Sequence, residues 1–390
     1  MNVCFDTFGC RLSRAEALQQ EADYLAAGWT KTDRHDRADL IIVRGCSVTA
    51  SAESDCRRLV AHLKRKYPFK KVLVTGCLDE KGTAGVVALP SQGAVPVRTA
   101  RAYLKVQDGC SGKCTFCTVP KFRGKARSED FTALIDKAKR FVEVGYHELV
   151  VTGCNLSLYA SQGKRLPELI SALAEVDAGC RVRLGSLEPG EVALPTVEAI
   201  AAHENCCRFL HLPVQSGSNR VLLAMGRNYK IDDVEKILGR AKELMPVIGL
   251  GCDLMTGFPG ETDGEYLATH GFLDSNPFSN AHIFPYSERP GTPAAGYPSA
   301  VPKGVRSERA RRLSDLAKKK RMEFAKTFRG KIVEAVIENT DHFSGWTSEY
   351  MRVGAIHPDS VFDRELKRKT MVKFKVVEVH GDRLGGKVYV

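Results

Sequence analysis

No stretch of this 390-residue sequence is apolar for long enough to cross a bilayer, and its first residues carry neither a basic segment nor a long apolar core. The sequence therefore predicts a cytoplasmic protein without membrane contact. Nothing in the composition predicts large-scale disorder, because 43% hydrophobic and 27% charged residues are ordinary for a folded chain. The length leaves room for two or three domains.

Acidic residues are in deficit, since 46 Asp and Glu stand against 58 Lys and Arg and give a formal net charge of +12. Such an excess favours a polyanionic partner, and without a membrane signal that partner is expected to be nucleic acid. Charge by itself also fits a basic protein that binds no nucleic acid.

Thirteen cysteines are present without a secretion signal, so reduced thiols and metal binding are expected in place of disulfides. Three of them, Cys110, Cys114 and Cys117, lie in one glycine-flanked stretch that lacks a fourth thiol. Three thiolates would leave one iron of a four-iron cluster open. An open iron can chelate S-adenosylmethionine, whose C–S bond is then cleaved by an electron. A partial zinc site and three unrelated thiols are the alternatives.

The N-terminal part predicts a small parallel α/β domain of three strands, at residues 3–8, 40–43 and 72–75, with helices at 14–27 and 50–66. A Gly-Cys pair follows each strand, and it contributes Cys10, Cys46 and Cys77. The carboxyl ends of parallel strands share one edge, so these cysteines are expected to meet there around a shared ligand. The alternative is three unrelated buried cysteines.

Beyond a weakly patterned segment at 78–100, short apolar stretches alternate with helical periodicity. Six β/α repeats predict an incomplete (β/α)6 barrel with its chemistry at the carboxyl ends of the strands. The expected strands are 103–106, 148–151, 181–184, 209–212, 249–255 and 281–284. The expected helices are 131–144, 166–176, 195–203, 219–225 with 232–244, and 263–274.

Polar, glycine-rich segments follow several of these strands and are candidate cofactor contacts. Glycine permits close approach of the backbone to a cofactor, and Glu188 or Gln215 could bond its amine or ribose hydroxyls. Each segment also fits a simple turn with a helix cap. The candidates are Phe116, Gly153, Asn155, Ser186, Glu188, Gln215, Ser216 and Gly257.

The C-terminal part predicts RNA contacts. Residues 305–331 form a basic helix that includes Arg311, Arg312 and Lys319, although a solvated face explains it equally well. Short strands at 332–337, 350–353, 371–379 and 386–390 predict a small β-barrel of the oligonucleotide-binding kind. Its candidate RNA-binding residues are Trp346, which fits a core position equally well, Tyr350, Arg352 and residues 367–369.

The cysteine spacing, with Phe116 before the last cysteine, resembles the signature of the radical S-adenosylmethionine superfamily. Nearly the whole chain is similar to the methylthiotransferases of that superfamily that modify tRNA. The resemblance implies an N-terminal domain at 1–95 that binds an auxiliary cluster, a radical SAM barrel at 96–328 and a TRAM-like β-domain at 329–390. The phrases Val-Gln-Asp-Gly-Cys, Gly-Ser-Leu-Glu-Pro and Ile-Phe-Pro-Tyr-Ser-Glu-Arg-Pro-Gly-Thr-Pro resemble the threonylcarbamoyladenosine branch.

That family assigns one [4Fe–4S] cluster to Cys110, Cys114 and Cys117 and another to Cys10, Cys46 and Cys77. The resemblance implies that one S-adenosylmethionine methylates sulfur at the auxiliary cluster. A second gives the radical that abstracts hydrogen from C2 of the adenine beside the anticodon. The implied partners are a tRNA anticodon stem-loop and an electron donor such as flavodoxin or ferredoxin, with no sulfur donor indicated.

The alternatives are isopentenyladenosine tRNA or a ribosomal-protein side chain as acceptor, and a non-catalytic iron–sulfur sensor that binds RNA. The sequence also departs from the family pattern. Ser13 stands where members usually carry Asn, and Arg44 and Gly45 stand where they usually carry Asn-Thr.

Overall fold

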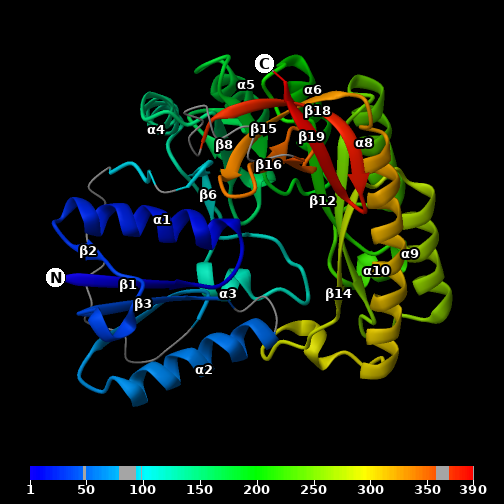
Figure 1. Cartoon of the computed structure of the whole chain (residues 1–390). Helices are drawn as coiled ribbons and strands as arrows, with labels where there is room; N and C mark the ends of the chain where they lie inside the picture. Colours follow the sequence, from blue (N-terminus) through cyan, green and yellow to red (C-terminus); the bar gives the residue numbers. More distant parts are fainter. Residues whose placement is uncertain (47–49, 79–93, 98, 357–368, 390) are drawn as a thin grey trace.

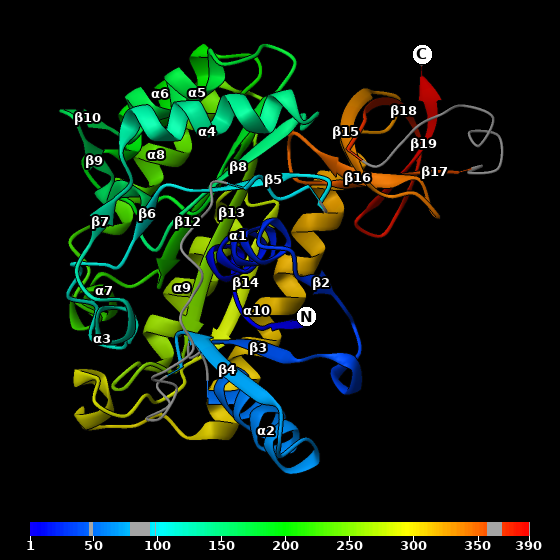
Figure 2. The same ribbon diagram turned by 90° about the vertical axis from the view of Figure 1, so that its left-hand side faces the viewer.

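The computed structural model describes residues 1–46, 50–78, 94–97, 99–356 and 369–389. Figures 1 and 2 show an N-terminal α/β domain, a curved wall of strands with helices outside it, and a small C-terminal β-barrel. The predicted fold class is therefore confirmed. The borders expected at 95/96 and 328/329 stay predictions. Residues 79–93, most of the expected linker, lie outside the described part of the chain.

The N-terminal domain is a parallel sheet in the order β2-β1-β3-β4. Val3 and Ile42 face Tyr24 of α1, whereas Cys4 and Ile41 face Cys56 of α2, so one helix covers each face. The edge strand β2 was not predicted, because two residues carry no alternating pattern. The elements are β1 (Asn2–Thr7), α1 (Arg11–Ala26), β2 (Thr30–Lys31), η1 (His35–Arg37), β3 (Leu40–Gly45), α2 (Ala50–Lys66) and β4 (Lys71–Gly76).

The described residues of the middle part form six parallel strands in two hydrogen-bonded groups, β5-β8-β11 and β12-β13-β14. Isolated bridges from Val182 to Cys206 and from Ser186 to His211 join the groups, so the predicted incomplete barrel is confirmed. The strands are β5 (Ala102–Lys105), β8 (Glu148–Thr152), β11 (Arg181–Leu184), β12 (Phe209–Gln215), β13 (Gly249–Thr256) and β14 (Asn280–Pro285).

Helices cover the outside of this barrel, where they pack on the apolar side chains that alternate along the strands. They are α4 (Phe131–Glu143), α5 (Leu166–Ala174), α6 (Ala193–Ala202), α7 (Asn219–Ala224), α8 (Ile231–Leu244), α9 (Asp263–Ser275) and α10 (Lys303–Lys326). Short elements decorate the loops: β6 (Gln107–Asp108), α3 (Val119–Arg123), β7 (Arg127–Ser128), η2 (Leu156–Leu158), β9 (Ala160–Ser161), β10 (Lys164–Arg165) and η3 (Pro293–Gly296). Among the described helices, none is both long and apolar enough to traverse a bilayer.

The C-terminal domain is a closed barrel in the order β15-β16-β17-β19-β18. The sequence predicted four of these strands and missed β16, whose Ser344 and Gly345 are poor strand formers. Gly345 is required there, because a Cβ atom would lie 2.0 Å from the carbonyl oxygen of Val336. The strands are β15 (Ile332–Asn339), β16 (Ser344–Thr347), β17 (Arg352–Ala355), β18 (Met371–His380) and β19 (Arg383–Tyr389).

A buried carboxylate, Glu148, attaches this domain to the barrel interior. Its side chain is fully buried and pairs with Arg181 at 2.6 Å, Arg183 at 2.7 Å and Arg101 at 3.5 Å. The same guanidinium groups reach the C-terminal domain, where Arg183 donates to the carbonyl oxygen of Thr347 at 2.8 Å. Arg181 donates to that of Trp346 at 2.6 Å. Glu148 thus holds the cations on which the docking depends.

We predict that Glu148→Gln destabilises the protein by about 3–5 kcal/mol, because the buried Arg181 and Arg183 lose their countercharge and Arg101 keeps only Glu338. Urea unfolding measures this loss. Glu191→Gln is the matched control, since Glu191 is exposed where it pairs with Arg165 and should matter little. Equal midpoints for Glu148→Gln and the wild type at pH 7 would refute the role of Glu148.

At acid pH, the free energies of unfolding of the wild type and Glu148→Gln should become more similar. Burial alone would raise the pKa of Glu148, but the three arginines lower it well below its ordinary value. The stabilisation is therefore complete above the ordinary carboxyl pKa of about 4.3 and is lost as the pH falls below it.

Candidate active site

The loop of Cys110, Cys114 and Cys117 lies between β6 and α3, at the carboxyl end of the barrel. Its backbone is fixed at both ends: Cys110 N donates to Gly124 O at 3.0 Å and Thr115 N to Met225 O at 3.0 Å. A Cβ atom on Gly112 would lie 3.2 Å from Cys110 Sγ and 3.8 Å from Cys114 Sγ. These two sulfur atoms therefore converge over a glycine that leaves room for a ligand.

Burial raises the pKa of Cys117 to about 11, and the charges of Cys114 and Cys110 add to this effect. Burial also raises the pKa of Cys114, and a bound cation would stabilise the thiolates of these neighbouring residues. The donor set thus fits an iron–sulfur cluster, as the sequence predicts.

Cys10, Cys46 and Cys77 lie together at one edge of the N-terminal sheet. Arg44 is the register partner of Thr7 on β1 and of Thr75 on β4, so the three strands end side by side. A Cβ atom on Gly9 would lie 3.3 Å from Cys46 Sγ, and Cys77 N donates to Gly45 O at 3.1 Å. Gly9 and Gly76 have φ values of 110° and 92°, which only glycine adopts readily.

Arg123, which the sequence analysis did not identify, joins the two cysteine groups. It lies at the end of α3, directly after the barrel cysteines, and its Nε donates to Cys77 Sγ at 3.0 Å. Its other nitrogens donate to Glu16 of α1 and to Asp108, each at 3.0 Å. Only 7% of the Arg123 side chain is exposed. One guanidinium group therefore connects the barrel loop to the N-terminal cysteines.

Further charges surround this contact. Lys105 pairs with both Glu16 and Asp108 at 2.7 Å, and Arg44 pairs with Glu16 at 2.8 Å. Burial alone would raise the pKa of Glu16, but Arg123 and Lys105 lower it. Burial raises the pKa of Cys154 to about 12, and its thiol lies 3.5 Å from Asp108. Arg44 thus pairs with the same Glu16 that Arg123 contacts from the barrel.

A second pair of charges joins the N-terminal domain to the opposite side of the barrel. Arg289, in the loop that follows β14, forms an ion pair with Glu53 of α2. Arg289 is buried, and the side chain of Arg123 is only 7% exposed. The N-terminal domain is therefore held at two places across the barrel mouth, which Figure 2 shows from the side.

Two of the predicted cofactor contacts, Phe116 and Glu188, surround a buried arginine beside the barrel cysteines. Arg227 pairs with Glu188, and its guanidinium carbon lies 5.6 Å from the centre of the Phe116 ring. Among the described residues, nothing accepts a hydrogen bond from the buried Arg227 Nε. A donor without a partner at this place fits a bound carboxylate, such as that of S-adenosylmethionine.

The other predicted cofactor contacts form the turns after the strands. Gly153 packs on Gln107, which also accepts from Asn155 N at 2.9 Å. Ser216 lies 3.3 Å from Thr269, and Gly257 N donates to Glu261 at 2.8 Å. Ser186 is exposed, whereas Gln215 is buried at a φ of 73°. Their contacts with a cofactor stay predictions.

The predicted RNA-binding residues lie in two places. On α10, Arg311 and Arg312 are exposed and pair with Glu308 at 2.9 and 2.8 Å, while Lys319 is exposed. In the C-terminal domain, the Tyr350 ring stacks between Trp346 at 4.5 Å and Phe209 at 4.6 Å.

Arg352 lies 6.0 Å from the centre of the Trp346 ring. Residues 367 and 368 lie outside the described part of the chain, and Lys369 is described. The RNA contacts stay predictions, and the stacked rings show that Tyr350 also packs on the barrel.

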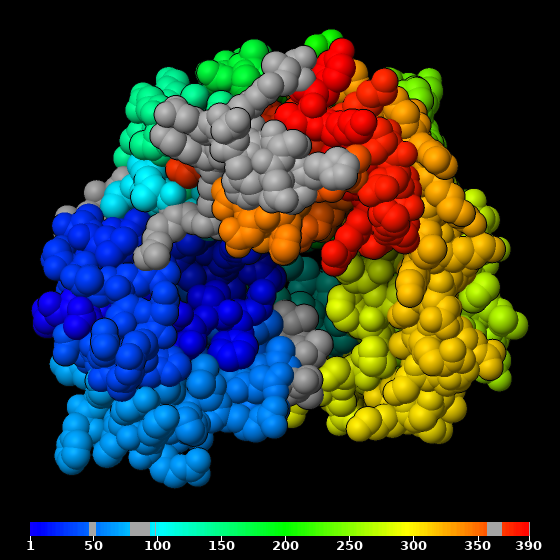
Figure 3. Space-filling model, viewed as in Figure 1, coloured from blue at the N-terminus to red at the C-terminus, as the bar shows by residue number. Residues whose placement is uncertain are grey.

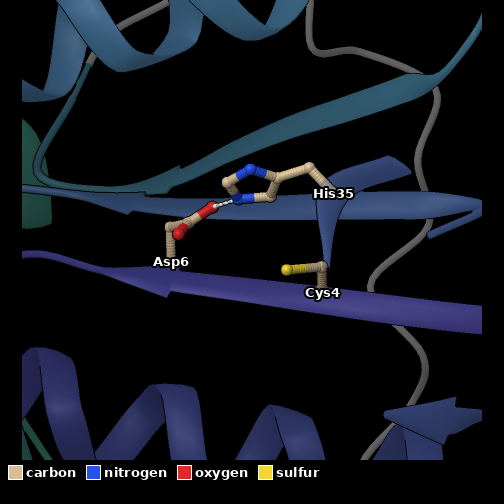
Figure 4. A group of neighbouring side chains, drawn as sticks. All are labelled: Cys4, Asp6 and His35. Atoms are coloured by element: carbon tan, nitrogen blue, oxygen red, sulfur yellow. Dashed lines mark hydrogen bonds and ion pairs between the residues drawn. The ribbon is translucent and has the colours of Figure 1, made fainter. Parts of the chain in front are cut away.

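Cys4 is one of the cysteines outside the two groups, and it is buried beside a polar pair. Figure 4 shows Cys4 and Asp6 on one face of β1, with His35 of η1 above them. His35 Nε2 lies 2.8 Å from Asp6 Oδ2. The Cys4 sulfur, an Asp6 carboxylate oxygen and a His35 ring nitrogen, which are atoms that could bind a metal ion, lie within 4.8 Å of one another. Burial raises the pKa of Cys4 to about 11. This group faces α2 within the N-terminal domain.

Two family models match the chain. The model described as the radical SAM superfamily matches residues 104–273, and the one described as uncharacterized protein family UPF0004 matches residues 2–95. The matched segments contain the barrel cysteines and the N-terminal cysteines, respectively.

Several curated relatives match nearly end to end. The threonylcarbamoyladenosine tRNA methylthiotransferase MtaB of Bacillus subtilis (strain 168) is 30% identical over 90% of this chain and 89% of that protein. MtaB of Thermotoga maritima is 30% identical over 99% of this chain and 98% of that protein. The tRNA-2-methylthio-N(6)-dimethylallyladenosine synthase of Acetivibrio thermocellus is 28% identical over 86% of this chain and 80% of that protein.

Among solved structures, the radical S-adenosylmethionine methyltransferase TsrM of Kitasatospora setae aligns with a TM-score of 0.56. The alignment covers 75% of this chain and 76% of that one at 13% identity, which shows a shared fold.

We predict that Arg123→Gln loosens the contact between the N-terminal domain and the barrel, because Glu16, Asp108 and Cys77 lose a buried donor. Hydrogen exchange should rise together in α1 and in the barrel cysteine loop. Arg127→Gln is the matched control: Arg127 also approaches Asp108, at 3.7 Å, but 62% of its side chain is exposed. Unchanged protection in Arg123→Gln, or equal effects of both substitutions, would contradict this assignment.

Proposed function

We propose that this chain, which belongs to the radical S-adenosylmethionine tRNA methylthiotransferases, adds a methylthio group to C2 of N6-threonylcarbamoyladenosine next to the anticodon. We further propose that it acts in the cytoplasm and takes its electrons from a flavodoxin or ferredoxin. The observation that carries the proposal is that Arg123 follows one cysteine group in the chain and donates to a sulfur atom of the other.

The chemistry explains why two cysteine groups should be adjacent. An aromatic C–H bond offers neither an acidic proton nor an electrophilic centre, so polar substitution at C2 is slow. A radical that removes the hydrogen atom and a sulfur atom held nearby avoid this barrier, provided that both reach one base. Domains fixed at Glu16–Arg123 and Glu53–Arg289 support such proximity.

In this proposal Cys110, Cys114 and Cys117 hold one [4Fe–4S] cluster, and Cys10, Cys46 and Cys77 hold the other. When bound, the clusters supply the electron for S-adenosylmethionine cleavage and the site of sulfur loading. Arg227 orients the carboxylate of S-adenosylmethionine, and Arg123 donates a hydrogen bond to a cysteine sulfur of the N-terminal group. Such hydrogen bonds tune the potential of a cluster.

The substrate tRNA would lie against α10 and the C-terminal domain. Glu308 neutralises part of the charge of Arg311 and Arg312, so the exposed Lys318 and Lys319 are the better candidates for phosphate contacts. The choice of threonylcarbamoyladenosine follows the names of the MtaB relatives. Dimethylallyladenosine, named in other relatives, is the second candidate.

The triple variant Cys10→Ala, Cys46→Ala, Cys77→Ala tests the division of labour. We expect about eight iron atoms per chain in the reconstituted wild type and about four in this variant. The variant should still cleave S-adenosylmethionine to 5′-deoxyadenosine but transfer no methylthio group to tRNA. Methylthiolated product from it would remove the role assigned to the N-terminal cysteines.

Three comparisons complete this test. The variant Cys110→Ala, Cys114→Ala, Cys117→Ala should no longer cleave S-adenosylmethionine. An iron sensor without catalytic activity would not cleave it even as the wild type. The variant Cys180→Ala, Cys206→Ala, Cys252→Ala is the control for the loss of three thiols, because these cysteines are buried in the barrel core. Mass spectrometry of nucleosides from cells with and without the gene then identifies the modified base. A methylthio product on dimethylallyladenosine alone would contradict the choice of substrate.

The double substitution Lys318→Ala, Lys319→Ala should weaken tRNA binding and reduce its salt dependence. The slope of log K against log salt should fall by about 1 for each lost phosphate contact. Lys139→Ala on α4 is the control, since Lys139 is equally exposed but lies on another helix. A wild-type affinity that is insensitive to salt would refute this contact surface.

A further inference from the structure

The inner wall of the barrel is polar and open, unlike the packed interior of a complete barrel. Residues of β12, β13 and β14 that point inward include His211, Gly251, Asp253 and His282, and 53% of the His282 side chain is exposed. Figure 3 shows a hollow bounded by the N-terminal domain in blue, the C-terminal domain in orange and red, and yellow-green segments of the barrel.

Three side chains of this wall act as one polar group. His211 Nε2 lies 2.9 Å and His282 Nδ1 3.1 Å from the same oxygen, Asp253 Oδ1. The register explains the convergence: His282 lies directly across from Asp253, and His211 lies across from Gly251, which has no side chain to separate them. A Cβ atom on Gly251 would lie only 2.5 Å from His211 Nδ1.

The two imidazoles present fixed donors to Asp253. Burial alone would raise the pKa of Asp253, but the hydrogen bonds from His211 and His282 lower it well below its ordinary value. The carboxylate therefore stays charged and accepts from both rings. His282 keeps its Nε2 atom on the exposed side of the ring, where it lies 3.4 Å from Asn280 Nδ2. The wall thus offers hydrogen-bonding groups to a ligand in the hollow.

An aromatic ring lies between this polar group and the strand ends. Phe284 follows His282 by two residues on β14, so both side chains point to the same side, and 39% of Phe284 is exposed. Asp253 precedes Gly257, at the strand end, by four residues, or about 13 Å at 3.3 Å per residue. An exposed aromatic face at this level offers a stacking platform for a base.

The floor of the hollow is closed below the polar group. Phe209, two residues before His211, stacks on Tyr350 of the C-terminal domain at 4.6 Å. The guanidinium carbon of Arg183 lies 5.4 Å and that of Arg11, next to Cys10, 5.1 Å from the centre of the Tyr350 ring. A ligand that enters from the strand ends would therefore stop at the level of His211, Asp253 and His282.

We propose that His211, Asp253 and His282 form the binding site for the polar N6 substituent of the substrate adenosine, while Phe284 stacks on its base. This inference rests on the proposed function, because it takes C2 of the base to be the reacting atom at the strand ends. The N6 substituent is attached at a different edge of the adenine ring from C2. With C2 at the strand ends, the substituent would extend into the hollow. The ureido N–H and hydroxyl groups of a threonylcarbamoyl substituent can donate hydrogen bonds to this polar wall, where Asp253 and His282 offer acceptors.

An apolar dimethylallyl group would instead cover the exposed Nε2 edge of His282 without offering it a hydrogen bond, which is costly. The site therefore deepens the proposed function: it makes the polar wall the physical reason why one N6 substituent is accepted and the other refused. Discrimination of this kind is strong when a substrate lacks the groups that a polar site requires.

Equilibrium binding of anticodon stem-loops to the anaerobically reconstituted protein tests the proposal. Three stem-loops are compared, with N6-threonylcarbamoyladenosine, N6-dimethylallyladenosine or plain adenosine at the same position. The wild type should bind the stem-loop with N6-threonylcarbamoyladenosine at least about tenfold more tightly than the stem-loop with plain adenosine. His282→Leu should abolish this preference and leave the affinity for plain adenosine unchanged.

His282→Asn, which keeps a hydrogen-bonding side chain, should restore part of the preference, and Phe284→Leu should weaken all three stem-loops alike. His270→Leu on the outer helix α9 is the control and should behave as the wild type. Urea unfolding midpoints of the variants that match the wild type would show that the barrel is intact.

A preference for threonylcarbamoyladenosine that survives in His282→Leu would overturn the site, as would equal binding of all three stem-loops by the wild type. A wild type that shows the preference but yields no methylthiolated product would refute the proposed function and leave the binding site standing. The two proposals therefore fail in different measurements.

Discussion

The position of the N-terminal domain against the barrel depends on one guanidinium group, which belongs to the barrel and binds the N-terminal domain. Arg123 donates to Cys77 at 3.0 Å and shares Glu16 and Asp108 with Lys105. Because these charges are largely removed from water, each needs its partners, and separating the domains would leave several of them unpaired. The cost of separation keeps the two cysteine groups beside one another. A reaction that needs two cofactors at one base requires this constraint.

The open interior of the barrel depends on a second buried set of charges. A (β/α)8 barrel fills its interior with branched side chains, whereas this one has glycines, histidines and an aspartate on the inward side of β12 to β14. Glu148 and its arginines hold the C-terminal domain against the base of the barrel, where Tyr350 closes the floor. The hollow is thus bounded by three parts of the chain, and the proposed substrate pocket requires all three to be docked.

The sequence alone predicted the repeating strands and helices, because apolar periodicity and Gly-Cys pairs at strand ends are local signals. Six short strands of the described residues escaped prediction, because two to four residues carry too little pattern of their own; they are β2, β6, β7, β9, β10 and β16. The same holds for Arg123, Arg227 and the group of His211, Asp253 and His282. Each is an unremarkable residue in its own segment and gains a function only from partners on other elements. Arg227 comes directly after Met225 and Gly226, where helix α7 has ended. A glycine at a helix end is a weak signal, but it could have identified Arg227 as a candidate site residue.

Anomalous diffraction at the iron edge, from crystals of the reconstituted protein, would locate its iron. We expect two iron centres, one at Cys110, Cys114 and Cys117 and one at Cys10, Cys46 and Cys77. Both should open onto the hollow that His282 lines, with the Arg123 guanidinium beside Cys77. A single iron centre, or an N-terminal centre that faces away from the barrel, would contradict this expectation.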